Sequence, residues 1–214
     1  MDLTHLRQEY ADAGLAVDDL AADPIEQFRR WFGAWRDVAV GEPEAMVVTS
    51  STLDGRPSVR MVLLRRFDAD GFVFFSNRDS RKGREMAANP RVALLFPWHP
   101  VGRQVIVEGT AAPISDEDSD AYWVTRPRGS QIAASASPQS QVVPDRTTLE
   151  ERFAELERRH EGRPVPRPDH WGGTCVSPDR VEFWQNRDRR MHDRLVYWRD
   201  TTRSSGWRIE RLAP

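Results

Sequence analysis

The stretch Ser80-Arg81-Lys82-Gly83-Arg84 places cationic side chains at the expected start of a helix. The first backbone N–H groups of a helix have no partner within it, and the helix dipole favours an anion there. Two cations beside those groups suit a phosphate, although a solvated helix start with incidental charge explains them too. Lys82 favours the phosphate, because it is the single lysine among 31 cationic residues, the other thirty being arginine. A compact ammonium is not interchangeable with a planar guanidinium.

A second group of polar residues comprises Tyr122, Arg126, Arg128 and Ser130. Residues four positions apart share one face of a helix, so Tyr122 and Arg126 would lie together, with Ser130 just beyond the helix end. A phenol, a guanidinium and a hydroxyl could clamp a phosphate. Ordinary polar surface accounts for the same residues equally well.

The third group is Arg190-Met191-His192-Asp193-Arg194. If a strand begins here, residues 190, 192 and 194 alternate onto one face, near Trp184 of the preceding strand. Two guanidiniums and an imidazole could then bind an anionic or electron-rich aromatic ligand. The alternative is an exposed cationic strand face paired with nearby acids.

Other catalytic patterns are missing from the sequence. The five histidines have no metal-ligand spacing with Cys175, so no metal site is expected. G-x-S-x-G, Walker A and G-x-G-x-x-G motifs are also lacking. Phosphate-suited sites, many aromatic residues and no hydrolytic nucleophile together favour binding of a phosphorylated aromatic cofactor.

Many strands and a few helices must position these residues. Asp23 as N-cap and Pro24 at the first helical position predict a helix, followed later by helices near 80–88, 115–126 and 148–160. Asp54-Gly55 and Asp70-Gly71 predict turns that join the first three strands into a meander. We expect a mainly β, α+β fold of the β-barrel kind, as one domain over 1–214 with 1–22 as an N-terminal arm. The strands are expected at 45–53, 58–67, 72–76, 91–96, 103–112, 180–185, 192–199 and 207–212.

Charge and composition narrow the functional class. The net charge of -2 argues against a nucleic-acid binder and against a polybasic membrane-surface protein. No run of about 18 apolar residues could span a bilayer, and the mixed, acidic first residues do not resemble a secretory signal. A single cysteine suits a reducing compartment. These observations predict a soluble, cytoplasmic protein.

The ordered motifs along the chain resemble the pyridoxine (pyridoxamine) 5′-phosphate oxidase family, and the likeness covers nearly the whole chain. The resemblance implies an FMN-binding split β-barrel, a flavoprotein that forms two FMN sites across a homodimer interface. The motifs are LRQEY at 6–10, RMVLL at 60–64, SRKG at 80–83, LFPWH at 95–99, RQV at 103–105, RPRGSQ at 126–131, WGG at 171–173, VEFWQ at 181–185, RMHDR at 190–194 and RLAP at 211–214.

The resemblance also implies roles for individual residues. Arg190 and His192 would act as catalytic residues that position and polarise the substrate ring. The residues implied to bind FMN are Arg60, Met61, Val62, Leu63, Leu64, Arg65, Phe75, Ser76, Arg81, Lys82, Gln104, Gln139, Ser140, Trp184 and Arg194. Those implied to bind substrate are Arg7, Gln8, Glu9, Tyr10, Arg65, Tyr122, Arg126, Ser130, Arg190, Met191 and His192.

The implied reaction oxidises pyridoxine or pyridoxamine 5′-phosphate to pyridoxal 5′-phosphate by hydride transfer to FMN, with O2 as acceptor and H2O2 as product. Arg65 stands where the family usually has lysine, Phe75 stands where tyrosine is common, and 186–189 replaces a more glycine-rich turn. These departures leave two alternatives open. One is a related split-barrel flavoenzyme that oxidises another aromatic, such as a phenazine precursor. The other is a non-catalytic protein that binds flavin or pyridoxal phosphate.

Overall fold

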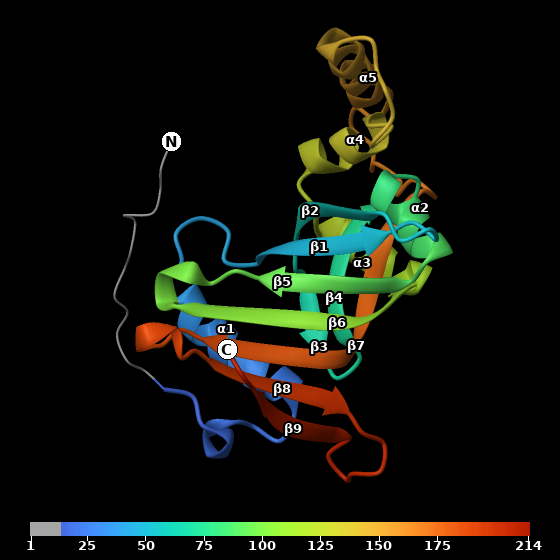
Figure 1. Cartoon of the computed structure of the whole chain (residues 1–214). Helices are drawn as coiled ribbons and strands as arrows, with labels where there is room; N and C mark the ends of the chain where they lie inside the picture. Colours follow the sequence, from blue (N-terminus) through green and yellow to red (C-terminus); the bar gives the residue numbers. More distant parts are fainter. Residues whose placement is uncertain (1–13) are drawn as a thin grey trace.

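In the computed structural model, which describes residues 14–214, a nine-stranded antiparallel sheet curls around a hydrophobic core (Figure 1). The strands are β1 (Ala45–Ser51), β2 (Pro57–Leu63), β3 (Arg66–Asp68), β4 (Gly71–Asn77), β5 (Arg91–Phe96), β6 (Arg103–Pro113), β7 (Trp171–Gln185), β8 (Asp193–Arg199) and β9 (Trp207–Leu212). The helices are α1 (Pro24–Arg36), α2 (Arg81–Ala88), α3 (Asp116–Thr125), α4 (Arg128–Ala136) and α5 (Arg146–Arg159), with short 3-10 turns at Val17–Asp19, His99–Val101 and Asp188–Arg190.

The long strand β7 is the point at which the sheet divides. It pairs with β6 along its length, with β4 through its first half and with β8 through its second half. The order β2-β1-β5-β6-β7 therefore continues along two branches, β4-β3 and β8-β9. A bulge lies at Gly109 of β6, where a Cβ would come within 2.1 Å of the Ser177 carbonyl oxygen, so the close approach of the strands requires glycine.

Helix α1 fills the inside of the curled sheet. It begins as predicted, with the Asp23 carboxylate accepting hydrogen bonds from the backbone N–H groups of Ile25 and Glu26. Phe28 is fully buried and makes edge-on ring contacts with Phe67, Phe72 and Phe96 at 4.8–4.9 Å between centroids. This apolar cluster fixes the helix against the β4-β3 branch and against β5.

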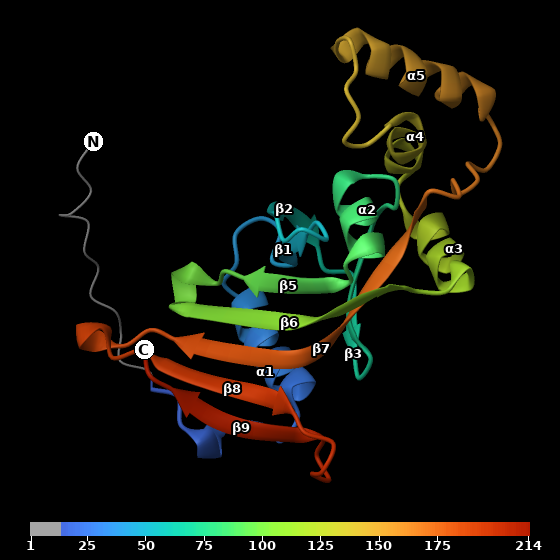
Figure 2. The same ribbon diagram turned by 45° about the vertical axis from the view of Figure 1, so that its right-hand side comes forward.

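Helices α3, α4 and α5 lie beyond one end of the sheet (Figure 2). A smaller core of Trp123, Ile132, Val165 and Trp171 joins α3 and α4 to the start of β7. Helix α5 has no fully buried residue and projects furthest from the sheet. No helix within 14–214 has the length and apolar character needed to cross a membrane.

Three expectations about the strands are wrong. The expected strand 58–67 breaks into β2 and β3, because Leu64 turns into the core and Arg65 turns out of it. The expected meander is not formed, since β2 lies at one edge of the sheet while β3 and β4 form a branch at the other end. Strand β7 begins at 171 rather than 180, so it runs from the small core to the far side of the sheet.

Candidate cofactor and substrate site

A cavity of about 510 Å³ lies between the first strands and the helices α2 to α4. Its size falls in the range of small-molecule sites. It brings together Lys82 from the first predicted phosphate group and Tyr122, Arg126 and Ser130 from the second. It also includes Gln139 and Arg65, for which the resemblance implied ligand contacts. The remaining lining residues are Met61, Val62, Leu63, Phe75, Ser76, Asn77, Pro127, Ala133, Ala134, Ser137 and Trp171.

Lys82 lies at one end of this cavity, in the first turn of α2. Its Nζ donates to Gln139 Oε1 at 2.7 Å and to Ser80 Oγ at 3.2 Å, and only 8% of the residue is exposed. Ser80 is also the N-cap of α2 and accepts a hydrogen bond from the backbone N–H of Gly83. Burial, together with the nearby charge of Arg60, lowers the pKa of Lys82 to about 8.

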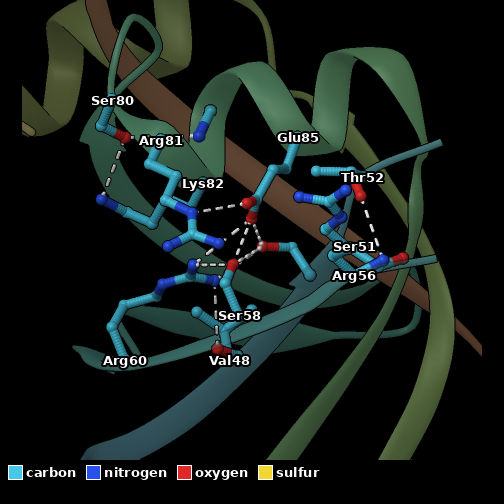
Figure 3. Close-up of polar contacts among 12 residues, drawn as sticks. Val48, Ser51, Thr52, Arg56, Ser58, Arg60, Ser80, Arg81, Lys82 and Glu85 are labelled. Carbon is cyan, nitrogen blue, oxygen red and sulfur yellow. Dashed lines mark hydrogen bonds and ion pairs between the residues drawn. The ribbon is translucent and has the colours of Figure 1, made fainter. Parts of the chain in front are cut away.

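Two arginines and a carboxylate stand beside Lys82 (Figure 3). Arg60 extends from β2, and Arg81 lies next to Lys82 in α2. Both guanidiniums pair with Glu85, at 3.4 Å for Arg60 and 2.8 Å for Arg81. The three cations and the one carboxylate carry a net charge of +2, and Lys82 is the member of this group that lines the cavity.

This cluster fits the phosphate of FMN. A phosphomonoester carries a charge of about -1.5 to -2 near pH 7, which matches the net charge of the cluster. The ammonium of Lys82 offers donors from a buried position on the cavity wall. The site therefore has the charge and the donors that the phosphate of FMN requires.

The opposite part of the cavity has an aromatic wall. The rings of Phe75 and Tyr122 stack at 3.9 Å between centroids, and Trp171 lies nearly parallel to both. The Arg126 guanidinium lies over the Trp171 ring at 4.6 Å. Its Nε is buried without a hydrogen-bond partner among residues 14–214. Burial lowers the pKa of Arg126, so this cation is desolvated and available to an anionic ligand.

Arg65 also lines the cavity and lies close enough to Arg126 to affect it electrostatically. Its Nη1 donates to Glu44 Oε1 at 3.1 Å, and its charge contributes to the lowered pKa of Arg126. Two guanidiniums, the Tyr122 hydroxyl and Ser130 thus border one space. Arg65 lines the cavity at the position where the family that the sequence resembles usually has lysine.

A third group of predicted residues lies elsewhere in the chain. Gln104, Trp184 and Arg194 are register partners in a row across β6, β7 and β8. The His192 ring lies 4.7 Å from the Trp184 ring, and His192 Nδ1 accepts a hydrogen bond from the backbone N–H of Arg187. Arg194 Nε donates to Glu182 at 2.7 Å.

These residues cannot reach the cavity within one chain. Trp171, which lines the cavity, and Trp184 lie near opposite ends of β7. At about 3.3 Å per residue the strand between them spans roughly 40 Å. A site that uses both groups therefore requires a second copy of the chain.

Residues 34–160 match the family described as pyridoxamine 5′-phosphate oxidase, and residues 171–214 match the pyridoxine 5′-phosphate oxidase C-terminal dimerisation region. The pyridoxine/pyridoxamine 5′-phosphate oxidase of Rubrobacter xylanophilus is 58% identical, with 100% of this chain and 97% of the relative covered. The enzyme of the same name from Nocardioides sp. is 52% identical, over 100% of this chain and 99% of the relative. The chain belongs to the pyridoxine/pyridoxamine 5′-phosphate oxidase family.

Solved structures of related proteins have the same fold. PhzG from Burkholderia lata 383, in complex with tetrahydrophenazine-1-carboxylic acid, is 32% identical with a TM-score of 0.87, covering 95% of this chain and 99% of PhzG. A pyridoxamine 5′-phosphate oxidase-related, FMN binding protein from Nostoc punctiforme has a TM-score of 0.69 at 15% identity, covering 94% of this chain and 100% of that protein. The predictions of family, split-barrel fold and FMN as cofactor are confirmed.

Several residues predicted to contact FMN or substrate are distinctive in their burial or their backbone conformation. The Leu64 side chain lies in the core, and its backbone N–H donates to the Glu44 carbonyl at 2.9 Å, so neither is available for the predicted contact with FMN. Ser140 lies next to Gln139 with a φ of 69°, and Arg189 and Arg190 have φ of 54° and 60°. Left-handed backbone at residues other than glycine is uncommon and gathers at functional sites. Met191 is 67% exposed. The predicted contacts Arg7, Gln8, Glu9 and Tyr10 lie outside the described residues.

Sequence reasoning missed two members of the site. Trp171 belongs to a motif of the family but was not named among the ligand contacts, and its position became clear only from the length of β7. Glu85 was not expected in the site either, although it lies four residues after Arg81 in one helix. That spacing is typical of an ion pair and could have identified it.

Proposed function

We propose that the chain is an FMN-dependent oxidase that converts pyridoxine or pyridoxamine 5′-phosphate to pyridoxal 5′-phosphate, using O2 and releasing H2O2. The observation that carries the proposal is one cavity with two separate cationic ends, one around Lys82 and one around Arg126. Such a cavity suits two phosphorylated ligands, a cofactor and a substrate.

The cofactor end of the site would be formed by the cluster around Lys82. Arg60, Arg81 and Lys82 would neutralise the FMN phosphate, with Gln139 and Ser140 beside them. Residues 60–65 of β2 and the following turn, with Phe75 and Ser76 of β4, would line the flavin.

The substrate end would hold the second phosphate. Arg65, Tyr122, Arg126 and Ser130 border this space. Arg126 Nη2 donates to the Ser130 carbonyl at 3.1 Å, and its buried Nε has no hydrogen-bond partner among residues 14–214. When bound, FMN would accept a hydride from C4′ of the substrate and pass the electrons to O2. The chain would hold the substrate phosphate so that C4′ faces the flavin, and orientation of this kind can supply much of a rate enhancement.

A second copy of the chain would complete each site. Gln104, Trp184 and Arg194 would flank the flavin from the partner copy, and Arg190 and His192 would lie against the substrate ring. Roughly 40 Å of β7 separates this group from the cavity of its own chain, and the match of 171–214 to a dimerisation region supports a homodimer. We further propose a cytoplasmic protein whose residues 1–214 form one domain, with 1–22 as an arm beside the substrate.

A second candidate function comes from the similarity to PhzG, whose structure holds a tetrahydrophenazine carboxylic acid. That ligand is an aromatic-type carboxylic acid without a phosphate. The cavity here has two guanidiniums, a phenol and a hydroxyl at its substrate end, more than a single carboxylate needs. The substrate end therefore favours a phosphorylated ligand.

The proposal is tested by turnover of the FMN-loaded protein. Pyridoxine 5′-phosphate, pyridoxamine 5′-phosphate and unphosphorylated pyridoxine are supplied with O2, and aldehyde and H2O2 are measured. We expect one aldehyde and one H2O2 for each O2 consumed, with the phosphorylated compounds strongly preferred. Flavin binding without turnover of either phosphorylated compound would contradict the oxidase and leave the phenazine-type enzyme or a binding protein.

A further inference from the structure

Glu85 is a buried carboxylate in the middle of the cationic cluster (Figure 3). It lies in α2, faces β1 and β2, and is 6% exposed. Its burial needs a physical reason, because a charged side chain is costly to bury unless it is paired and hydrogen-bonded.

Each oxygen of Glu85 has its own set of partners. Oε1 accepts from Arg81 Nε at 2.8 Å. Oε2 accepts from Ser50 Oγ at 2.6 Å and from Ser58 Oγ, and it pairs with Arg60 Nη2 at 3.4 Å. The carboxylate thus joins an arginine of α2 to an arginine of β2.

The two serines extend this arrangement to Arg60. Its Nη1 donates to Ser50 Oγ at 2.6 Å and to the Val48 carbonyl at 3.3 Å, and its Nη2 donates to Ser58 Oγ. Arg60 is therefore fixed at several atoms, and each of its serine partners also contacts Glu85. A side chain held in this way loses little further entropy when it binds a ligand.

Glu85 remains ionised through the neutral range. Burial raises its pKa, but the hydrogen bonds from Ser50, Ser58 and Arg81 outweigh burial and bring the pKa down to about 2. Its negative charge offsets one of three neighbouring cations, and Lys82 is close enough to Arg60 for the charge of Arg60 to lower its pKa. The carboxylate therefore pairs directly with Arg60 and Arg81, and Arg60 in turn acts on Lys82.

We propose that Glu85 is a positioning residue for cofactor phosphate: it holds Arg60 and Arg81 side by side so that both can face the phosphate of FMN. The inference rests on the proposed function, because it takes the cluster around Lys82 as the FMN phosphate site. Glu85 itself makes no contact with the phosphate, since two like charges repel.

The test compares FMN with riboflavin, which has the same ring and ribityl chain but no phosphate. Apoproteins of the parent, Glu85→Ala and Glu85→Gln are titrated with each ligand and followed by flavin fluorescence. The matched control is Asp116→Asn, which removes a carboxylate paired with two other arginines, Arg78 and Arg167, outside the cavity. Thermal unfolding of each apoprotein reports whether the variant folds.

We expect Glu85→Ala to raise the Kd for FMN by about tenfold or more, with the riboflavin Kd changed by less than about twofold. Glu85→Gln keeps the size of the side chain and one acceptor, so we expect the ratio of the FMN Kd to the riboflavin Kd to rise by about threefold or more. This variant decides the test if Glu85→Ala does not fold. Asp116→Asn keeps the parent ratio.

A second readout separates positioning from general loss of structure. In the parent, FMN binding weakens above about pH 8, where free Lys82 loses its proton. Glu85→Gln removes a negative charge from beside the cations, so the onset of weakening moves to lower pH, by roughly half a unit or more. The onset for Asp116→Asn stays at the parent value.

Three results would overturn the inference. The first is that the parent prefers FMN to riboflavin and that both Glu85 variants keep this preference and the pH at which FMN binding begins to weaken. That result would refute Glu85 as a positioning residue and leave the proposed function intact. Tighter FMN binding in Glu85→Gln would show that Glu85 only competes with the phosphate. A parent that binds FMN no better than riboflavin would refute the phosphate site itself, and with it both proposals.

Discussion

Replacing Lys82 by methionine tests the cofactor end of the cavity. Methionine keeps most of the aliphatic stem of a side chain that is 92% buried, and it removes only the ammonium that contacts Gln139 and Ser80. A hydrogen bond to a charged group contributes about 1.5–3 kcal/mol. Loss of about 2 kcal/mol corresponds to a roughly 30-fold higher Kd for FMN, while riboflavin should bind almost as before.

The pH dependence makes this prediction sharper. The pKa of Lys82 is about 8 in the free protein, because burial and the charge of Arg60 lower it, and a bound phosphate dianion raises it. Below pH 8 the ammonium is protonated in both states, so FMN affinity does not change with pH through this group. Above pH 8 the free protein loses the proton that the complex keeps. FMN binding then takes up a proton and weakens by up to about tenfold per pH unit.

Fluorescence titration of apoprotein with FMN between pH 6.5 and 9.5 measures both effects. The parent should show a flat region and then a falling affinity above about pH 8. Lys82→Met should show a weaker affinity without that fall. A variant with parental FMN affinity, or with the same fall above pH 8, would refute the assignment of Lys82 to the phosphate.

Other predictions concern the substrate end of the cavity, the predicted catalytic residue Arg190 and the stability of the fold. Arg126→Gln should raise KM for the phosphorylated substrate by about tenfold or more while FMN Kd is unchanged; an unchanged KM would remove Arg126 from the clamp. Arg190→Ala should lower kcat with flavin still bound, and normal kinetics would exclude Arg190. Tyr197→Phe should cost about 1 kcal/mol in urea unfolding, because the buried hydroxyl donates to the Ala21 carbonyl at 2.6 Å; no change would show that this bond has no net value. Burial raises the pKa values of Glu182 and Asp193, but hydrogen bonds and arginine partners outweigh burial, so both pKa values lie below their usual range. The two ionised carboxylates therefore stabilise the fold above about pH 4.5, and this stabilisation is lost as the pH falls further. A Tm equal at pH 6 and pH 3 would contradict this.

The local elements could be predicted from the sequence because their signals are short-range. Asp23 and Pro24 define the start of α1, and the predicted N-cap bond is present. Ser115 likewise caps α3 by accepting from the backbone N–H of Asp118. The Asp70-Gly71 turn is also present, joining β3 to β4.

The arrangement of the strands could not be predicted in the same way. Spacing within β2 and β4 says nothing about the branch point in β7, which depends on pairings between residues 61 to 104 positions apart. The Asp-Gly turns favoured a meander, but the burial of Leu64 breaks the second strand and directs the chain to the other branch. Long-range packing therefore overrode a correct local prediction.

The candidate site, too, could be predicted from the sequence only in part. The charges of Lys82 and Arg126 were recognisable from composition and helical spacing, and the cavity brings both together. The contact of Glu85 with Arg60 joins a helix to a strand 25 residues away in sequence, so no local pattern reveals it. The separation of His192 from the cavity depends on the length of β7, which the sequence did not define.

The most direct test of the central claim is addition of pyridoxamine 5′-phosphate to the FMN-loaded protein without O2. We expect the absorbance of the bound flavin to fall as one pyridoxal 5′-phosphate is formed per flavin. Admitting O2 should restore the absorbance and yield one H2O2. Lys82→Met loaded at saturating FMN should behave in the same way. A parent protein whose bound flavin keeps its absorbance at saturating substrate would contradict the account.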